Sequence, residues 1–143
     1  MPQLSIILEK RAPVVHLLAP DQTVAEAVET MCERRVGAVL IGEQSRLLGI
    51  FSERDLLRRV IGKGLRLDQT PLREVMTENP ITAEPSDDRM SAIRKMQVHG
   101  CRHLPIVEGG AVSDTVSIRD LLFAEIKERE TEIAELKRYI QGA

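Results

Sequence analysis

Two short segments carry the residues best suited to bind a ligand. Ser52-Glu53-Arg54-Asp55 follows an apolar run, and Ser117-Ile118-Arg119-Asp120 repeats its pattern sixty-five residues later. In both segments the Ser-x-x-Asp spacing predicts a capping box, which by itself explains the serine and the aspartate. It does not explain the arginine, because a cation in the first helical turn opposes the helix dipole. A bound anion would reverse that cost, so the pattern predicts two phosphate-binding junctions, with purely structural capping as the alternative.

The two junctions belong to a longer internal repeat. The pairs Pro20 and Pro85, Met31 and Met96, and Ile41 and Ile106 all keep the same offset of sixty-five residues without a gap. An ungapped match of this length indicates duplication of a β-α-β-β-α unit. In the first copy we predict strands at 14–18, 37–41 and 47–51 and helices at 23–35 and 53–61; in the second, strands at 79–83, 103–107 and 111–116 and helices at 88–98 and from 118 onward.

The predicted fold class is α+β, with the two copies packed about a pseudo-two-fold axis. Each copy is too small to bury its sheet alone, so the copies should pack face to face and leave a related pocket at each junction. We expect the N-terminal segment and first repeat at residues 1–70, the second repeat at 71–126 and a helical extension at 127–143.

The extension carries an apolar seam with roughly heptad spacing. Its apolar positions are Leu122, Ile126, Ile133, Leu136 and Ile140, among Glu, Lys and Arg residues. A helix of this kind exposes its seam unless it meets a partner surface. We therefore expect it to dock on another subunit, most simply in a homodimer.

Composition excludes several function classes. The chain has 143 residues, 43% of them hydrophobic, and a net charge of -2. No apolar run is long enough to span a membrane, so we expect no membrane segment and a cytoplasmic protein. Aromatic residues make up only 2% of the chain. The sequence therefore shows neither base-stacking platforms nor a basic face, and nucleic acid is an unfavoured partner.

One group of residues has a metal-like spacing. His99, Cys101 and His103 alternate and would share a face if they lay on one strand. They supply only three ligands, so packing or phosphate contact is favoured over a metal site. Motifs of phosphate loops, zinc proteases and serine hydrolases do not occur in the sequence. We expect no enzyme, no metal and no catalytic cofactor.

Several motifs together resemble the tandem cystathionine β-synthase (CBS) domain pair, often called a Bateman module. They are residues 36–41 (VGAVLI), 74–82 (EVMTENPIT) and 102–107 (RHLPIV), and the two Ser-x-Arg-Asp junctions. The resemblance covers almost the whole chain, and its tail is similar to that of small bacterial proteins made only of a CBS pair. It implies adenosine-containing ligands: AMP, ADP, ATP, NAD(H) or S-adenosylmethionine.

The resemblance also implies a role for individual residues. Asp55 and Asp120 would bind the ribose diol, and Ser52 and Ser117 would contact ribose or phosphate. The remaining implied binding residues are Arg54, Arg119, Val15, His16, Leu17, Gly37, Ala38, Pro80, Ile81, Thr82, Arg102 and His103. The sequence departs from the family pattern at one position. The residue before the hydrophobic pair of the last strand is usually glycine, as Gly49 is in the first half, but the second half has Asp114. This carboxylate could repel phosphate or narrow the second pocket.

We therefore expect a non-enzymatic regulatory module that binds an adenine nucleotide between its repeats and signals occupancy to a partner. The alternative is a dimerising scaffold protein with the same fold and unoccupied clefts.

Overall fold

The computed structural model describes residues 3–142, so the outermost residues of the predicted domains, 1–2 and 143, lie outside it. The elements before the midpoint are α1 (Leu4–Leu8), β1 (Leu17–Leu18), α2 (Val24–Arg34), β2 (Ala38–Glu43), β3 (Arg46–Ser52), α3 (Glu53–Asp55), a π-helical turn η1 (Leu56–Val60) and a 3-10 turn η2 (Ile61–Lys63). After it come α4 (Leu72–Val75), β4 (Thr77–Glu78), α5 (Arg89–His99), β5 (His103–Glu108), β6 (Ala111–Ser117) and α6 (Ile118–Gly142).

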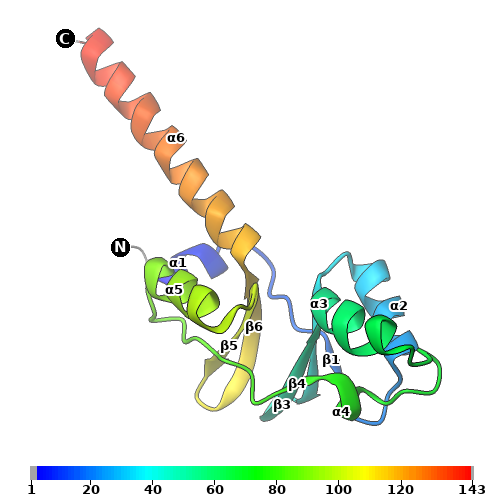
Figure 1. The fold of residues 1–143 in the computed structure, drawn as a ribbon. Helices are drawn as coiled ribbons and strands as arrows, with labels where there is room; N and C mark the ends of the chain where they lie inside the picture. The colour runs from blue at the N-terminus through cyan, green and yellow to red at the C-terminus, as the bar shows by residue number, and fades with distance from the viewer. Residues whose placement is uncertain (1–2, 143) are drawn as a thin grey trace.

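The strands form one sheet in each half of the chain. In the first, β1 runs parallel to β2, β2 pairs antiparallel with β3, and β3 pairs antiparallel with β4. In the second, β5 and β6 form an antiparallel pair. Figure 1 shows the two sheets facing each other, with α2 and α3 on the outside of one and α1 and α5 on the outside of the other.

The duplication predicted from the sequence is confirmed by the register of the strands. The β2–β3 pairing begins with Ala38 opposite Ser52, and β5–β6 begins with His103 opposite Ser117 at the same offset. Both hairpins also shift register at corresponding positions, after Ile41 and after Ile106. Two segments with the same hydrophobic pattern have thus folded into the same hairpin, because the pattern decides which face is buried.

Three apolar clusters hold the molecule together. One fills the first half around Phe51, and another fills the second half around Leu104. A third lies between the sheets and joins Leu40 and Ile50 to Val112. The Val112 N–H also donates to the Gln44 carbonyl at 2.9 Å. This third cluster fixes how the halves face each other, and so sets the width of the clefts between them.

The predicted strand at 79–83 is wrong. Asn79 takes a left-handed conformation with φ 47°, and Pro80 cannot donate to a ladder. The strand forms earlier, at Thr77–Glu78 against Gly49 and Ile50. Only Ala83 keeps a parallel bridge, with Ile106. The chain therefore turns at residues 79–81 instead of running straight.

The predicted strand at 14–18 is shortened to Leu17–Leu18. The helix predicted at 53–61 forms, but its hydrogen-bond pattern changes from α to π to 3-10 along its length before Gly64 ends it at φ 70°. Pieces of π-helix inside helices often accompany functional sites.

The two ends of the described chain both attach to the second half. Leu4 on α1 is fully buried in its core and its N–H donates to the Asp87 carbonyl at 2.8 Å. Arg89 on α5 is 4% exposed and forms an ion pair of 2.7 Å with Glu128 on α6. Beyond this pair α6 projects away from the body, as Figure 1 shows. Within residues 3–142, no helix combines the length and apolar character needed to cross a membrane.

Phe51 tests the core of the first half. It is fully buried, so Phe51→Ala should lower the free energy of unfolding by about 3–5 kcal/mol, measured by urea denaturation. Phe123→Ala is the matched control, since its ring is 57% exposed and should cost less than about 1 kcal/mol. Equal losses in the two variants would contradict this description of the core.

Candidate functional site

A cavity of about 930 Å³ opens between the two halves at the first Ser-x-Arg-Asp junction. Most of its wall comes from the start of the helix after β3, the turn after β4, and the loop that joins α5 to β5; Gly37, just before β2, completes it. The residues lining it are Gly37, Ile50, Ser52, Glu53, Arg54, Asp55, Leu57, Arg58, Arg59, Thr77, Asn79, Pro80, Ile81, His99, Gly100, Cys101, Arg102 and His103.

The predicted capping box forms at this junction and holds Asp55 in the cavity wall. The Ser52 N–H donates to Asp55 Oδ2 at 2.9 Å, and the Asp55 N–H faces Ser52 Oγ at 3.4 Å. Ser52 Oγ also donates to Oδ2 at 3.1 Å. Asp55 is only 8% exposed. One carboxylate oxygen is thus committed to the helix start, and the side chain has a fixed direction.

The other oxygen, Asp55 Oδ1, has two neighbours. The Thr77 hydroxyl donates to it at 3.1 Å, and Arg59 Nε lies 3.6 Å away. A carboxylate oxygen can accept two hydrogen bonds. Since the arginine contact is long, Oδ1 retains capacity for a donor from the cavity, such as a hydroxyl group.

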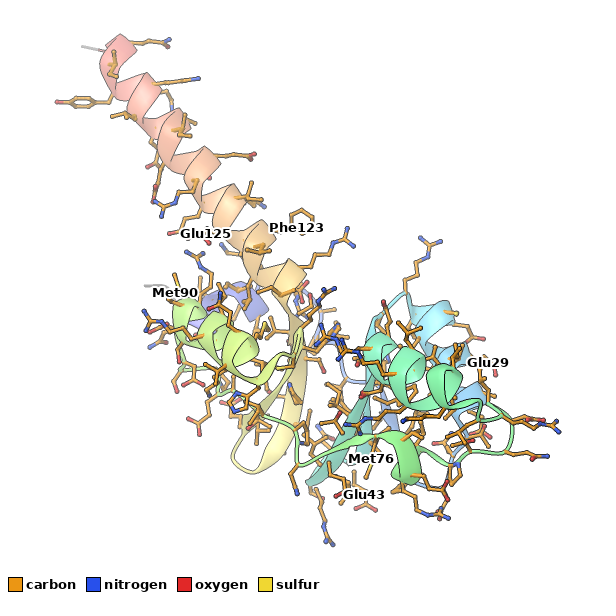
Figure 2. All side chains as sticks on the ribbon, viewed as in Figure 1. Glu29, Glu43, Met76, Met90, Phe123 and Glu125 are labelled. Carbon is orange, nitrogen blue, oxygen red and sulfur yellow. The ribbon has the colours of Figure 1, made fainter. Side chains whose placement is uncertain are left out.

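The cavity wall carries more cations than anions. Arg54, Arg58, Arg59 and Arg102 line it, against the carboxylates of Glu53 and Asp55. Arg54 donates to the Gly100 carbonyl, a contact that crosses from the first half to the second. No carboxylate in the described part of the chain lies within ion-pair distance of Arg58 or Arg102. Figure 2 shows nitrogen-bearing side chains gathered in this region between the halves. The surplus positive charge favours an anionic group in the cavity.

Gly37 and His103 lie close together in the cavity wall. A Cβ added to Gly37 would lie 2.8 Å from Glu53 Oε1 and 3.1 Å from His103 Nε2, so a larger residue does not fit without movement. Burial lowers the pKa of His103; Glu53 and Asp120 oppose this effect, and Arg102 adds to it. The imidazole is therefore mostly uncharged at neutral pH.

The second junction forms its own capping box but has different neighbours. The Ser117 N–H donates to Asp120 Oδ2 at 3.0 Å, and the Asp120 N–H donates to Ser117 Oγ at 3.1 Å. Arg11 Nη2 lies 3.6 Å from the same Oδ2 atom. The Arg119 guanidinium lies 5.2 Å over the Phe123 ring, a cation–π contact. The two junction arginines, alike in sequence, thus make different contacts.

Half of the residues singled out from the sequence line the cavity. Ser52, Arg54, Asp55, Gly37, Pro80, Ile81, Arg102 and His103 do so. Ser117, Arg119, Asp120, Val15, His16, Leu17, Ala38 and Thr82 are not among its lining residues. Val15, Leu17 and Ala38 pack in the cluster between the sheets instead. The His16 carbonyl accepts from the Leu40 N–H, and the Thr82 carbonyl accepts from Lys95 Nζ.

Two residues that contact Asp55 were missed. Thr77 belongs to the linker quoted above, and its hydroxyl reaches Asp55 only because β4 pairs with β3. Arg59 lies four residues after Asp55 on the same helix, and this spacing could have predicted their contact.

His99, Cys101 and His103 do not lie on one strand. His99 ends α5, Cys101 lies in the following loop, and His103 begins β5. All three line the cavity. Burial raises the pKa of the Cys101 thiol. Among residues 3–142, no group of three His, Cys, Asp or Glu side chains is placed to hold a metal ion.

Comparison with known proteins agrees with this architecture. The CBS domain family matches residues 10–62 and again 72–127. The chain is 32% identical over 118 residues to the CBS domain-containing protein YhcV of Bacillus subtilis, covering 82% of this chain and 84% of that protein. It is 36% identical over 127 residues to the mitochondrial CBS domain-containing protein CBSX3 of Arabidopsis thaliana, covering 85% of this chain. The chain spans 62% of the length of CBSX3 and about a fifth of the longer Arabidopsis relatives.

Solved structures show the same arrangement. A CBS domain protein from Pyrobaculum aerophilum, solved in complex with AMP, superposes with a TM-score of 0.77 at 30% identity, covering 91% of this chain and 99% of that one. A CBS-domain containing protein from Agrobacterium tumefaciens gives a TM-score of 0.81 at 28% identity, covering 87% of this chain and 99% of that one.

The fold and the matches together define a tandem CBS-domain protein. The chain belongs to the CBS domain family, with two domains in one polypeptide.

His103 makes the stability of the protein depend on pH. Its pKa in the folded state lies below its unfolded value of about 6.5, so the unfolded chain binds more protons in mild acid. The stability contributed by neutral His103 is therefore present above pH about 6.5 and is lost as the pH falls below it.

The prediction is that His103→Asn reduces the fall in thermal midpoint between pH 7.5 and pH 5.5. Gln97→Asn, an exposed position on α5 with no titratable group, is the control and should leave that fall unchanged. An identical fall in wild type and His103→Asn would show that His103 does not titrate as described.

Proposed function

We propose that this chain is a regulatory module that binds an adenosine-containing ligand in the cavity beside Asp55 and signals occupancy to a partner. The ligand class comprises AMP, ADP, ATP, NAD(H) and S-adenosylmethionine. Family membership supports a regulatory role, and the AMP complex of the related Pyrobaculum protein supports an adenine nucleotide. Neither the comparisons nor the cavity supplies a reason to expect catalysis.

The observation that carries the proposal is the placement of Asp55. Its side chain is largely buried, and the capping box holds its carboxylate in one direction. The same residue lines a cavity of about 930 Å³. Small-molecule sites typically enclose roughly 300–1,000 Å³. A ribose has two neighbouring hydroxyl donors, and a fixed carboxylate is a suitable acceptor for them. Asp55 would therefore orient the ribose, and Ser52, next to Asp55 in the cavity wall, would contact the ribose or the phosphate.

The cations would bind the phosphate end of the ligand. Arg58 and Arg102 are not neutralised by a carboxylate within residues 3–142, and Arg54, which also lines the cavity, donates to the Gly100 carbonyl. Guanidinium groups pair well with phosphate because their planar donors match two oxygens at once. Pro80 and Ile81 line the same cavity and would offer apolar surface for the adenine ring.

Binding would change how the halves sit relative to each other. The cavity draws residues from both halves, and the Arg54–Gly100 contact joins them on its cationic side. A ligand that touches both sides binds one arrangement more tightly than others and increases its population. At a concentration one hundred times its Kd it would stabilise the folded chain by about 2.7 kcal/mol.

Self-association would provide a surface through which occupancy is communicated. The seam of α6 leaves Ile133 at 54% and Leu136 at 60% exposure. Phe123 points away from the body at the base of the same helix, as Figure 2 shows. Pairing with α6 of a second copy would cover the seam and produce the homodimer expected from its heptad spacing.

The same seam favours a second candidate function, a dimerising scaffold whose clefts stay empty. The two functions differ in ligand binding. A thermal-shift series with AMP, ADP, ATP, NADH and S-adenosylmethionine should show stabilisation by at least one of them if the chain is a sensor. A flat response to all five would favour the scaffold.

Asp55 can be tested with a conservative change. Asp55→Asn removes one acceptor and the charge, and hydrogen bonds to charged groups contribute about 1.5–3 kcal/mol each. Affinity for AMP, measured by calorimetry, should fall at least about tenfold. Asp88→Asn is the control, because Asp88 also accepts from a backbone N–H at a helix start, that of Ser91 on α5, and does not line the cavity. Unchanged affinity in Asp55→Asn would rule out this binding mode.

The α6 surface can be tested separately. Ile133→Glu places a charge in the apolar seam, so the protein should elute as a monomer in size-exclusion chromatography with light scattering. Thr131→Glu adds the same charge two residues away, outside the seam, and should leave the dimer intact. If both variants behave alike, α6 is not the dimer surface.

A further inference from the structure

One difference between the two halves lies at a pair of positions beside the junctions. Gly49 in the first half corresponds to Asp114 at the offset of sixty-five, and Met76 corresponds to Arg11. A Cβ on Gly49 would lie only 2.6 Å from Met76 Sδ, so the methionine side chain rests directly against this glycine. In the second half the same two positions hold a carboxylate and a guanidinium instead. An apolar contact beside the first junction is therefore an ion pair beside the second.

Arg11 makes its contacts inward, toward the second junction. Arg11 Nη1 donates to Asp114 Oδ1 at 3.0 Å, and Nη2 donates to the Thr115 carbonyl at 2.9 Å. Nη2 also lies 3.6 Å from Asp120 Oδ2. We call these three side chains, Arg11, Asp114 and Asp120, the Arg11 cluster. It joins the segment before β1 to β6 and to the first turn of α6.

Asp114 is fixed as firmly as Arg11. It is 3% exposed, and its Oδ1 atom also accepts from the Val14 N–H at 3.0 Å and the Thr115 N–H at 2.7 Å. In the first half, the backbone of β4 pairs with β3 at this place. The segment before β1 contains Pro13, which has no N–H for such a pairing. The Asp114 side chain thus fastens this segment in place of a β-ladder.

The cluster leaves little capacity for a ligand at Asp120. Nη1 of Arg11 also donates to the Ala12 carbonyl at 3.1 Å, and Nε is buried without a partner among residues 3–142. The guanidinium is turned to protein acceptors, so it is not available to a phosphate. Its charge is balanced by Asp114 and Asp120, the latter being the counterpart of the proposed ribose acceptor. A ribose at Asp120 would have to compete with this cation.

We infer that the side chains of the Arg11 cluster block the second cleft to a ligand, so that the chain binds one nucleotide, at Asp55. This inference rests on the proposed function, because it takes each cleft to be a potential nucleotide site. Arg11 and Asp114 then determine how many ligands bind. Replacing them by the pair found in the first half, Met and Gly, should open the second cleft.

Calorimetry with AMP as the probe tests the inference. Wild type should bind one AMP per chain, and Asp55→Asn should weaken that binding at least about tenfold. The double variant Arg11→Met with Asp114→Gly should bind two. Adding Asp120→Asn to the double variant should return it to one, and adding Asp55→Asn should leave one site, at Asp120. Two sites in wild type, or one site in the double variant, would overturn the inference.

A stability measurement separates failure of the inference from failure of the proposed function. If no variant binds AMP, the proposed site at Asp55 fails. Urea denaturation then tests whether Arg11 and Asp114 stabilise the fold as a coupled pair. Arg11→Met and Asp114→Asn should each lower the midpoint, and the combination should lower it no further than the more damaging single change, because the two side chains act as one pair. Additive shifts would overturn the cluster as a coupled unit. A cooperative urea transition of the Arg11→Met, Asp114→Gly variant itself shows that the protein used for AMP binding is folded.

Discussion

The structure depends on one buried carboxylate placed where two copies of a fold meet. Asp55 begins a helix, and the backbone N–H of Ser52 holds one of its oxygens. The apolar cluster that joins Leu40 and Ile50 to Val112 fixes the opposing half. The same arrangement that caps a helix therefore also presents an acceptor to a space between the halves. Burying a carboxylate is costly unless it is hydrogen-bonded, and both Ser52 and Thr77 meet that need.

Duplication explains the architecture, and divergence between the copies explains the site. The hairpins keep one register, including a shared irregularity after Ile41 and Ile106. Near the junctions the copies differ: Arg54 bridges to Gly100, whereas Arg119 stacks on Phe123. A repeated backbone with changed side chains can thus build one open cleft and one that is internally filled.

Local sequence patterns predicted the elements and both capping boxes, because helix ends and alternating strands are decided by nearby residues. They failed at one local turn: Asn79 has a φ of 47°, a left-handed conformation that Asn adopts more readily than most residues other than glycine, and this turn replaced a predicted strand. They also failed where a contact joins distant positions. The contact between Arg11 and Asp114 spans 103 residues and has no local signal. Asp114 was noticed as a departure from the family pattern, but its partner could be found only in three dimensions.

The most direct test of the central claim is a crystal structure of the protein with AMP. The account predicts the ribose hydroxyls within hydrogen-bond distance of Asp55, with the phosphate facing the arginines on the cavity wall. AMP bound elsewhere, or a well-ordered complex in which no sugar contacts Asp55, would contradict it.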